Sequence, residues 1–260
     1  MSGIIFPEDF KRVVEETEVV HPDSEHNLMI SPEALENALI ATFRKIAELA
    51  KYETLAIGLS GGLDSSILTT IAVKSAGLTI IPVTIFSSLD HPDLLHAVAL
   101  IKHLKLWLNQ LGQFDSTRRE DKYELLCIAM KKANLKHLIL GDAVDELQGG
   151  YWQHEYPEKH LPLAFLPMDE LRKAVFEDMW KKLIPDHLAI LDKFARQYDI
   201  DVYLPYLALS QLLSKVPMFQ RIFYTTRKSL LRHLAVNLGI PNEIINRPKL
   251  GLGDALRTQF

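Results

Sequence analysis

A glycine- and serine-rich turn is the first segment of the chain whose residues could do chemistry. It reads Gly-Leu-Ser-Gly-Gly-Leu-Asp-Ser-Ser over residues 58–66, between an apolar run and a helical pattern. Glycines let a backbone approach an anion closely, and the unpaired N–H groups at a helix start attract negative charge. Ser60, Ser65 and Ser66 add hydroxyl donors. The turn is therefore a candidate phosphate site, with a helix cap after a tight turn as the plainer alternative.

Asp64 is unexpected in a turn that binds only anions, because its carboxylate would repel phosphate. A bridging Mg²⁺ removes this conflict, since magnesium binds carboxylates together with phosphate oxygens. The turn lacks the Lys-Ser/Thr pair of the mononucleotide-binding loop and the Gly-x-Gly-x-x-Gly spacing of the dinucleotide-binding loop. We therefore expect Asp64 to bind a metal ion while the backbone amides hold the phosphates.

A second acidic segment follows another strand-like apolar run. Asp142, Asp145 and Glu146 place three carboxylates within five residues, with glycines on both sides. In an open parallel sheet, ligands bind at the carboxyl ends of the strands, where these acids are expected. Asp145 is therefore predicted to share the metal ion with Asp64. The acids could instead simply begin a helix, where negative charge is favourable.

The two segments resemble motifs of a known family. Residues 60–66 resemble the pyrophosphate-binding loop of the ATP pyrophosphatase (PP-loop) superfamily, whose members cleave ATP between the α and β phosphates. Residues 141–151 resemble the G-x-G-x-D-E-x-x-x-G-Y stretch of the asparagine synthetase synthetase domain. Leu140 replaces a usual small residue there, and Ala143 a common glycine. The resemblance implies that ATP is bound by Leu59, Ser60, Gly61, Gly62, Asp64, Ser65, Ser66 and Gly141.

The resemblance continues downstream. Residues 204–207 resemble the family's P-[FY]-L-D element, with Ala208 in place of the aspartate. Residues 227–232 and 240–251 match its K-x-x-L-R helix and its P-x-x-I-x-x-R-x-K-x-G segment. Residues 227–257 hold six cations in an otherwise acidic chain, namely Arg227, Lys228, Arg232, Arg247, Lys249 and Arg257. Fixed cations stabilise the charge of leaving pyrophosphate, although a solvated basic helix face would look the same in composition.

The activity that the resemblance implies is that of an ATP-dependent, AMP-forming carbon–nitrogen ligase. A carboxylate would attack the α-phosphate to give an acyl-adenylate, which ammonia or an amine resolves with release of AMP. Lys228 is the first candidate to stabilise the adenylation transition state, and Lys249 is the second. Asp142 or Glu146 would orient the amine or remove its proton. ATP and Mg²⁺ are the expected cofactors.

Other readings of the same loop stay open. Only some thirty residues precede the first core helix, so we expect no glutaminase domain within the chain. Ammonia would be free, would come from a separate glutaminase, or would be replaced by a substrate amine. A tRNA- or nucleotide-modifying adenylase would use the same loop, and a non-catalytic nucleotide-binding protein would retain it. Leu140 and Ala208 are the features that favour the non-catalytic reading.

The elements that must position these residues follow an α/β pattern. Ser31, Pro32 and Glu33 are typical of a helix start, and apolar residues then recur at spacings of three and four. Strands are predicted over 54–60, 78–86 and 137–141, and helices over 64–76, 91–108 and 120–133. The end of 91–108 could instead be a short third strand. This alternation predicts a parallel twisted sheet with helices on both faces, of the adenine nucleotide alpha hydrolase-like kind.

After about residue 155 the predicted elements are all helices, over 168–182, 185–198, 207–213 and 227–238. We therefore predict an N-terminal extension (1–30), a nucleotide-binding α/β domain (31–155) and a mostly helical C-terminal part that completes the site (156–260). The 260 residues carry a formal charge of −4 and one cysteine, Cys127, which we expect in the core. The longest apolar runs are too short to span a membrane. These features favour a cytoplasmic protein with small-molecule substrates, and nucleic acid as a less favoured partner.

Overall fold

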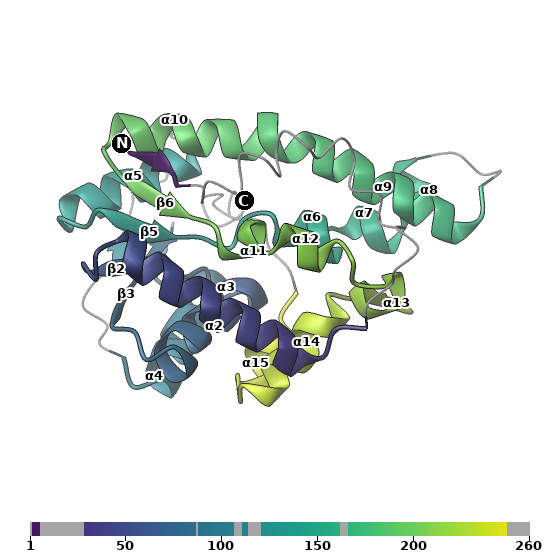
Figure 1. Ribbon diagram of the computed structural model, residues 1–260, viewed down its shortest axis with the longest axis horizontal. Helices are drawn as coiled ribbons and strands as arrows, with labels where there is room; N and C mark the ends of the chain where they lie inside the picture. Colours follow the sequence, from purple (N-terminus) through teal and green to yellow (C-terminus); the bar gives the residue numbers. More distant parts are fainter. Residues whose placement is uncertain are drawn as a thin grey trace.

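Six parallel strands form the central sheet of the protein (Figure 1). The computed structural model describes residues 2–5, 29–86, 88–106, 111–113, 121–161 and 166–248. The strands are β1 (Gly3–Ile4), β2 (Leu55–Gly58), β3 (Ile80–Phe86), β4 (Leu111–Gln113), β5 (His137–Ile139) and β6 (Asp201–Tyr203). Their order across the sheet is β1-β6-β5-β2-β3-β4. After β2 the chain moves outward to β3 and β4, and it then returns to the other side of β2 for β5 and β6. Such a reversal leaves a crevice between the two central strands, β2 and β5.

Helices cover the sheet in two layers (Figure 1). One layer holds α2 (Pro32–Leu49), α3 (Leu63–Thr70) with its π-helical continuation η1 (Ile71–Ser75), α4 (Pro92–His103) and α14 (Ser229–Asn237). The other holds α5 (Lys122–Lys132) and α10 (Ala189–Gln197), which is preceded by α9 (Met168–Leu183) and the π-turn η2 (Ile184–Leu188). The predicted fold class, a parallel α/β sheet with helices on both faces, is confirmed.

Short elements complete the connections around these layers. They are α6 (Val144–Gln148), α7 (Trp152–Glu155), α8 (Pro157–His160), α11 (Pro205–Ala208), α12 (Ser210–Leu213), α13 (Met218–Arg221), the antiparallel pair β7 (Ile222–Phe223) and β8 (Thr226–Arg227), and α15 (Asn242–Ile245). The helix predicted over 227–238 therefore begins later, because Arg227 lies in β8 and α14 starts at Ser229.

The helix α2 shows how local sequence determines an element. The Ser31 side chain caps it by accepting a hydrogen bond from Ala34 N at 3.1 Å, and Pro32 occupies the first turn, where its missing N–H is not needed. The predicted apolar stripe is buried except at its end, where Leu49 is exposed. The buried positions are Leu35, Leu39, Phe43 and Ile46.

The strand β3 contains a proline and still forms. Leu59 N donates to Val83 O, so Val83 points its backbone groups toward β2 and the neighbouring Pro82 points its own toward β4. Among the described residues, pairing with β4 begins at Thr84, so the missing N–H of Pro82 interrupts none of the ladder bonds described there. The alternative strand at the end of 91–108 falls mostly on residues outside the described ranges. The helix α4 ends at His103, and the edge strand is Leu111–Gln113.

Two strands of the sheet lie outside the region where strands were predicted. β6 pairs with β5 and comes from the C-terminal part, and β1 pairs with β6 and comes from the predicted N-terminal extension. One buried apolar cluster runs through all three predicted parts, including Ile4, Ile57 and Leu231. The division into 1–30, 31–155 and 156–260 stays a prediction, but the sheet crosses both of its boundaries. None of the helices in the described ranges combines the length and the apolar character needed to cross a bilayer.

Candidate active site

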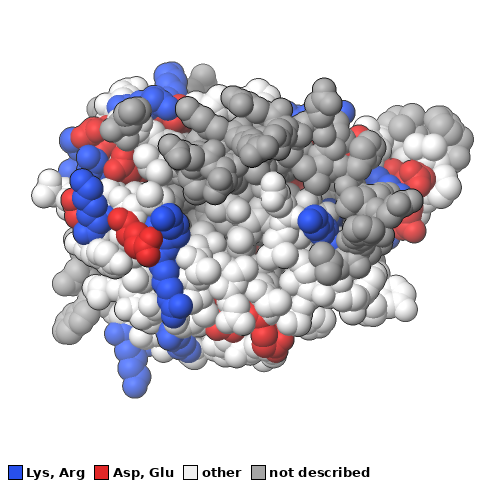
Figure 2. Space-filling view, viewed as in Figure 1, with Lys and Arg blue, Asp and Glu red and all other residues white. Residues whose placement is uncertain are grey.

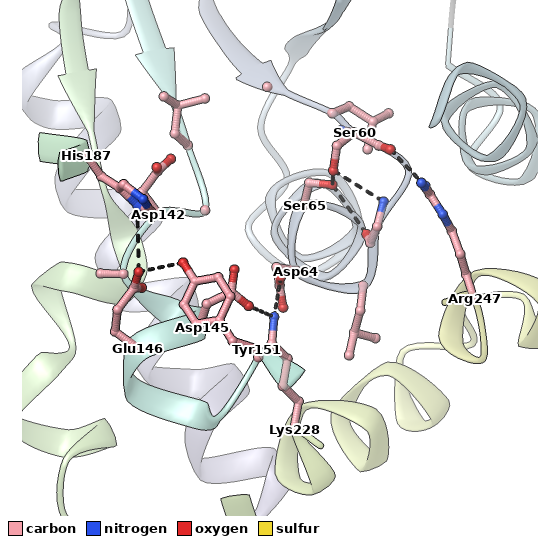
Figure 3. A pocket seen from close by; sticks show the side chains of 18 of the residues that line it. Ser60, Asp64, Ser65, Asp142, Asp145, Glu146, Tyr151, His187, Lys228 and Arg247 are labelled. Carbon is pink, nitrogen blue, oxygen red and sulfur yellow. Dashed lines mark hydrogen bonds and ion pairs between the residues drawn. The ribbon is translucent and has the colours of Figure 1, made fainter. Parts of the chain in front are cut away.

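A cavity of about 490 Å³ opens at the carboxyl edge of the sheet, over the crevice between β2 and β5 (Figure 3). Its walls come from the turn after β2, the turn after β5, the helix α6 and the segment from β8 to Pro248. The two motifs predicted to form the site, far apart in the chain, therefore face each other. Cavities of this size hold nucleotide-sized ligands.

Serine hydroxyls of the turn after β2 fix its backbone by accepting hydrogen bonds from within the turn. Ser60 N donates to Ser65 Oγ at 3.2 Å, and Gly62 N donates to Ser60 Oγ at 3.3 Å. The first bond of α3 runs from Ser66 N to Gly62 O, so the N–H groups of the three preceding residues have no helical acceptor. Leu59, Ser60, Gly62, Leu63, Asp64 and Ser65 line the cavity. The turn can therefore present several donors to an anion.

Two residues of the predicted nucleotide-binding turn do not line the cavity. Ser66 is fully buried, and Gly61 packs against the first turns of α4. Gly61 has φ +65°, and a Cβ atom there would lie 2.5 Å from Ala97 N and 2.7 Å from Asp93 O. Only glycine fits this position, because backbone atoms cannot move aside as a side chain can. The role of Gly61 is therefore to let the loop lie close to α4.

Asp64 and Asp145 meet at one ammonium group. Lys228 Nζ lies 2.5 Å from Asp64 Oδ2 and 2.5 Å from Asp145 Oδ1, so these two oxygens are within twice that distance of each other (Figure 3). Lys228 is buried, with 5% of its surface exposed. Burial alone would lower the pKa of Lys228, but Asp145 and Asp64 outweigh burial and raise it. The ammonium group therefore stays charged between the two carboxylates.

This arrangement suits a divalent cation that arrives with a nucleotide. In the described part of the chain, Asp64 Oδ1 is buried and accepts no hydrogen bond. Across the same ranges, no three His, Cys, Asp or Glu side chains are grouped as a metal site. The protein thus offers Mg²⁺ two carboxylates, and phosphates and water would complete its six oxygen ligands, as is usual for nucleotide-bound magnesium.

A tyrosine holds each of the other two acids at the far wall of the cavity. Tyr123 OH donates to Asp142 Oδ1 at 2.5 Å, and Tyr151 OH donates to Glu146 Oε1 at 2.7 Å. Burial, followed by the charge of Asp145, raises the pKa of Glu146 to about 7. Glu146 is thus poised to exchange a proton near neutral pH, the property required of a general base.

His187, which lines this wall, and Tyr123, which binds Asp142, were not predicted as site residues. His187 Nδ1 lies 3.7 Å from Glu146 Oε1, and burial lowers its pKa below the ordinary value. It comes from η2, and an interruption of a helix by π-helical turns often marks a functional site. Tyr123 is buried in α5, one residue after Lys122, which lines the cavity. No local motif marks these residues, because only the fold brings their elements to the strand ends.

The departures from the family motifs fall at different places. Leu140 lines the cavity beside Gly58, where a Cβ atom would lie 2.4 Å from Leu140 Cδ2. The bulkier residue therefore fits because position 58 is glycine. Ala143 takes a left-handed backbone with φ +76°, a conformation that glycine adopts without strain. Ala208 is exposed, whereas its neighbour Tyr206 is buried and donates to Asp64 O at 3.2 Å. Gly141 packs against Asp64, because a Cβ atom added to the glycine would lie 3.7 Å from Asp64 Cβ.

The basic segment divides into two kinds of contact. Lys228 contacts the carboxylates of Asp64 and Asp145, and three arginines bind backbone carbonyls. Two of these arginines also pair with a carboxylate, Arg227 with Glu155 at 3.4 Å and Arg247 with Asp93. Arg227 Nη1 donates to Gly150 O at 3.1 Å, Arg232 Nε donates to Arg227 O at 2.9 Å, and Arg247 Nη1 donates to Ser60 O at 3.0 Å. The arginines therefore support the loops that carry the acids and the glycines. Lys249 and Arg257 lie outside the described residues.

The core position predicted for the single cysteine is confirmed. Cys127 is fully buried, and burial raises its pKa to about 12. A thiol in this state is not a nucleophile at neutral pH.

Comparison with known proteins adds a family likeness. Residues 167–260 match the asparagine synthase family, so the resemblance predicted from the motifs is confirmed over that range. The search of curated proteins gives no significant match. Among solved structures, NMN synthetase from Francisella tularensis aligns at 16% identity with a TM-score of 0.38, over 85% of this chain and 76% of that chain. The family match supports an ATP-using enzyme of the PP-loop class.

Proposed function

We propose that the protein is an ATP-dependent, AMP-forming ligase that activates a carboxylate as an acyl-adenylate and transfers the acyl group to ammonia or an amine. The observation that carries this proposal is the convergence of Asp64, Asp145 and Lys228 beside the open turn after β2. Three groups from distant parts of the chain are assembled at the switch point of a parallel sheet, where such sheets bind ligands. The match of residues 167–260 to the asparagine synthase family supports the same chemistry.

Residues on the two sides of the cavity would act in different steps of the reaction. The donors of the turn would hold the phosphates, and the Lys228 ammonium group would oppose the charge that develops on pyrophosphate as the inner anhydride breaks. Magnesium, when bound between Asp64 and Asp145, would neutralise further charge on the phosphates. On the opposite wall, Glu146 or Asp142 would receive the proton that the amine loses when it attacks the acyl carbon.

Isotope exchange tests the proposal directly. Labelled pyrophosphate should enter ATP when the protein is incubated with Mg²⁺ and the correct carboxylate, because adenylation is reversible. Asp64→Asn and Asp145→Asn should each lower the exchange rate by about 10²–10³, the cost of deleting a preorganised charged group. Asp186→Asn is the matched control, since Asp186 is exposed and does not line the cavity.

The same assay separates the alternative functions. Formation of ADP instead of AMP would contradict the proposal. Exchange that requires tRNA would indicate a nucleic-acid-modifying adenylase, and nucleotide binding without exchange would indicate a non-catalytic protein. On the face drawn in Figure 2, the described Lys and Arg side chains are scattered, and several of them stand beside acidic ones. A mixed surface of this kind supports a small-molecule substrate over a nucleic acid.

A further inference from the structure

A buried ion pair between Arg247 and Asp93 lies beside the turn after β2, and Arg247 also lines the cavity. Arg247 Nη2 contacts Asp93 Oδ1, and the Arg247 and Asp93 side chains are 6% and 2% exposed. The same guanidinium group donates through Nη1 to Ser60 O at 3.0 Å (Figure 3). One planar side chain therefore joins the turn to the first turn of α4. A guanidinium group suits this task because its donors lie in a fixed fork.

Two contacts hold the turn after β2 in place beside α4. Gly61 lies so close to α4 that an added Cβ would overlap Asp93 O and Ala97 N, and Arg247 ties the preceding carbonyl to the same helix end. Asp93 itself is fixed, since its N–H donates to His91 Nδ1 at 3.2 Å and it occupies the helix start, where a negative charge is favoured. The position of the loop relative to α4 thus depends on the pair.

The pair also determines which way a loop amide faces. The peptide bond between Ser60 and Gly61 is planar and trans, so its C=O and its N–H point in opposite directions. Because Ser60 O is directed at Arg247, the Gly61 N–H is directed away from Arg247. Rotation of this peptide would break the contact with Arg247 and displace the backbone of Ser60, which lines the cavity.

We propose that Arg247 is a positioning residue: through its ion pair with Asp93 it fixes the Ser60 carbonyl and keeps the turn in its anion-binding conformation, without serving as a phosphate ligand. This inference rests on the proposed function, because it assumes that the turn binds the phosphates of ATP. It assigns a task to Asp93, which lies outside every motif of the sequence. It also distinguishes Arg247 from Lys228, although both belong to the same basic segment.

The direction in which Asp93→Asn changes the nucleotide affinity distinguishes a positioning role of Arg247 from direct phosphate contact. If Arg247 contacts phosphate, Asp93→Asn removes a competing negative charge, and nucleotide binding should stay the same or become tighter. If Arg247 acts through Asp93, the same substitution loosens the turn and weakens binding. We expect Asp93→Asn and Arg247→Met each to raise the dissociation constant of α,β-methylene-ATP with Mg²⁺ by about ten- to a hundredfold, the effect of a small misplacement.

Further variants test the geometry of the contact. Arg247→Lys keeps the charge but cannot hold Ser60 O and Asp93 together, so we expect it to bind the analogue as weakly as Arg247→Met. The double variant Asp93→Asn/Arg247→Met should be no weaker than either single one, because both remove the same contact. Asp90→Asn and Arg44→Met, at exposed positions, are the matched controls.

Hydrogen exchange of the protein without nucleotide gives an independent readout. Peptides that cover residues 58–68 should exchange faster in Asp93→Asn and Arg247→Met, while peptides from α10 keep the wild-type rate. Unchanged exchange in the turn, or tighter analogue binding by Asp93→Asn, would overturn the proposal. If Asp93→Asn does not fold, Asp93→Ser provides the same test with a residue suited to a helix start. Failure of the wild-type protein to bind the analogue would instead contradict the proposed function, and the exchange rates would still decide the role of Arg247.

Discussion

A single ammonium group, that of Lys228, contacts both aspartates at the centre of the site. Two carboxylates so close together repel each other, and their partial burial increases the repulsion because less water screens them. Lys228 removes this repulsion in the protein without ligand. Its backbone is left-handed, with φ +56°, where the chain leaves β8 for α14. A non-glycine residue in this conformation is strained, and such strain is common where a side chain must be aimed at a site.

Replacement of Lys228 by methionine should increase the affinity of the nucleotide-free site for a divalent cation. Without the ammonium group the two aspartates are left uncompensated, so Mn²⁺ should bind the nucleotide-free variant about tenfold or more tightly than it binds the wild type. Electron paramagnetic resonance of free Mn²⁺ measures this. The variant should also unfold at a lower temperature and lose pyrophosphate exchange. Equal Mn²⁺ affinity in both proteins would show that Lys228 does not occupy the cation position, and Lys215→Met controls for the loss of an exposed lysine.

Glu146 should make the stability of the protein depend on pH. Its pKa in the folded state, about 7, is above its ordinary value near 4.5, so the folded state binds the proton more tightly than the unfolded chain. The stability that comes from the bound proton is complete below pH 4.5 and is lost as the pH rises through 7. Glu146→Gln should therefore lose less stability than the wild type between pH 5 and pH 8, by about 1–3 kcal/mol. Urea unfolding at several pH values measures the difference, and parallel curves would contradict the expected titration.

The start of α6 shows strain where the family motif has a glycine. Ala143 is the N-cap of this helix and adopts φ +76° with ψ −16°. The left-handed region costs alanine about 1–2 kcal/mol that glycine does not incur. Against this, glycine loses more backbone freedom on folding and would remove a buried methyl group, each worth up to about 1 kcal/mol. The opposing terms are similar in size, so Ala143→Gly should be nearly neutral.

A matched alanine makes this expectation measurable. Ala195 is buried in the interior of α10, where the helical backbone favours alanine. Ala195→Gly should therefore lower the free energy of unfolding by about 1–2 kcal/mol more than Ala143→Gly does. Equal losses in chemical denaturation would mean that the backbone at Ala143 is unstrained.

Elements with a complete local signal were predictable, and those defined by distant pairing were not. Residues close together in the sequence determine the cap at Ser31, the apolar stripe of α2 and the turn at 58–66. β6 is only three residues long, too short for a periodic pattern, and it exists because β5 and β1 pair with it. The same holds within the site. Asp64 and Asp145 belong to motifs, whereas Asp93 and His187 acquire their places only when α4 and η2 pack beside the strand ends.

The position of β6 predicts that the central region cannot fold alone. A fragment of residues 31–155 would expose the edge of β5 and leave its apolar surface without α10 and α14. It would also lack the buried Val202, Leu231 and Leu234 of the common core. We expect this fragment to show no cooperative urea transition by circular dichroism, while the full chain unfolds in a single step. A cooperative transition of the fragment would instead establish residues 31–155 as an independent domain.

The pairing of β1 with β6 has a consequence for synthesis on the ribosome. Gly3 and Ile4 are translated well before their partners, Asp201 and Val202. Until β6 has emerged, β1 has no edge to join, and β5 presents unpaired backbone groups that a neighbouring nascent chain could capture. Conditions that slow elongation should therefore favour aggregation, and chaperones that shield emerging polypeptides should improve the yield.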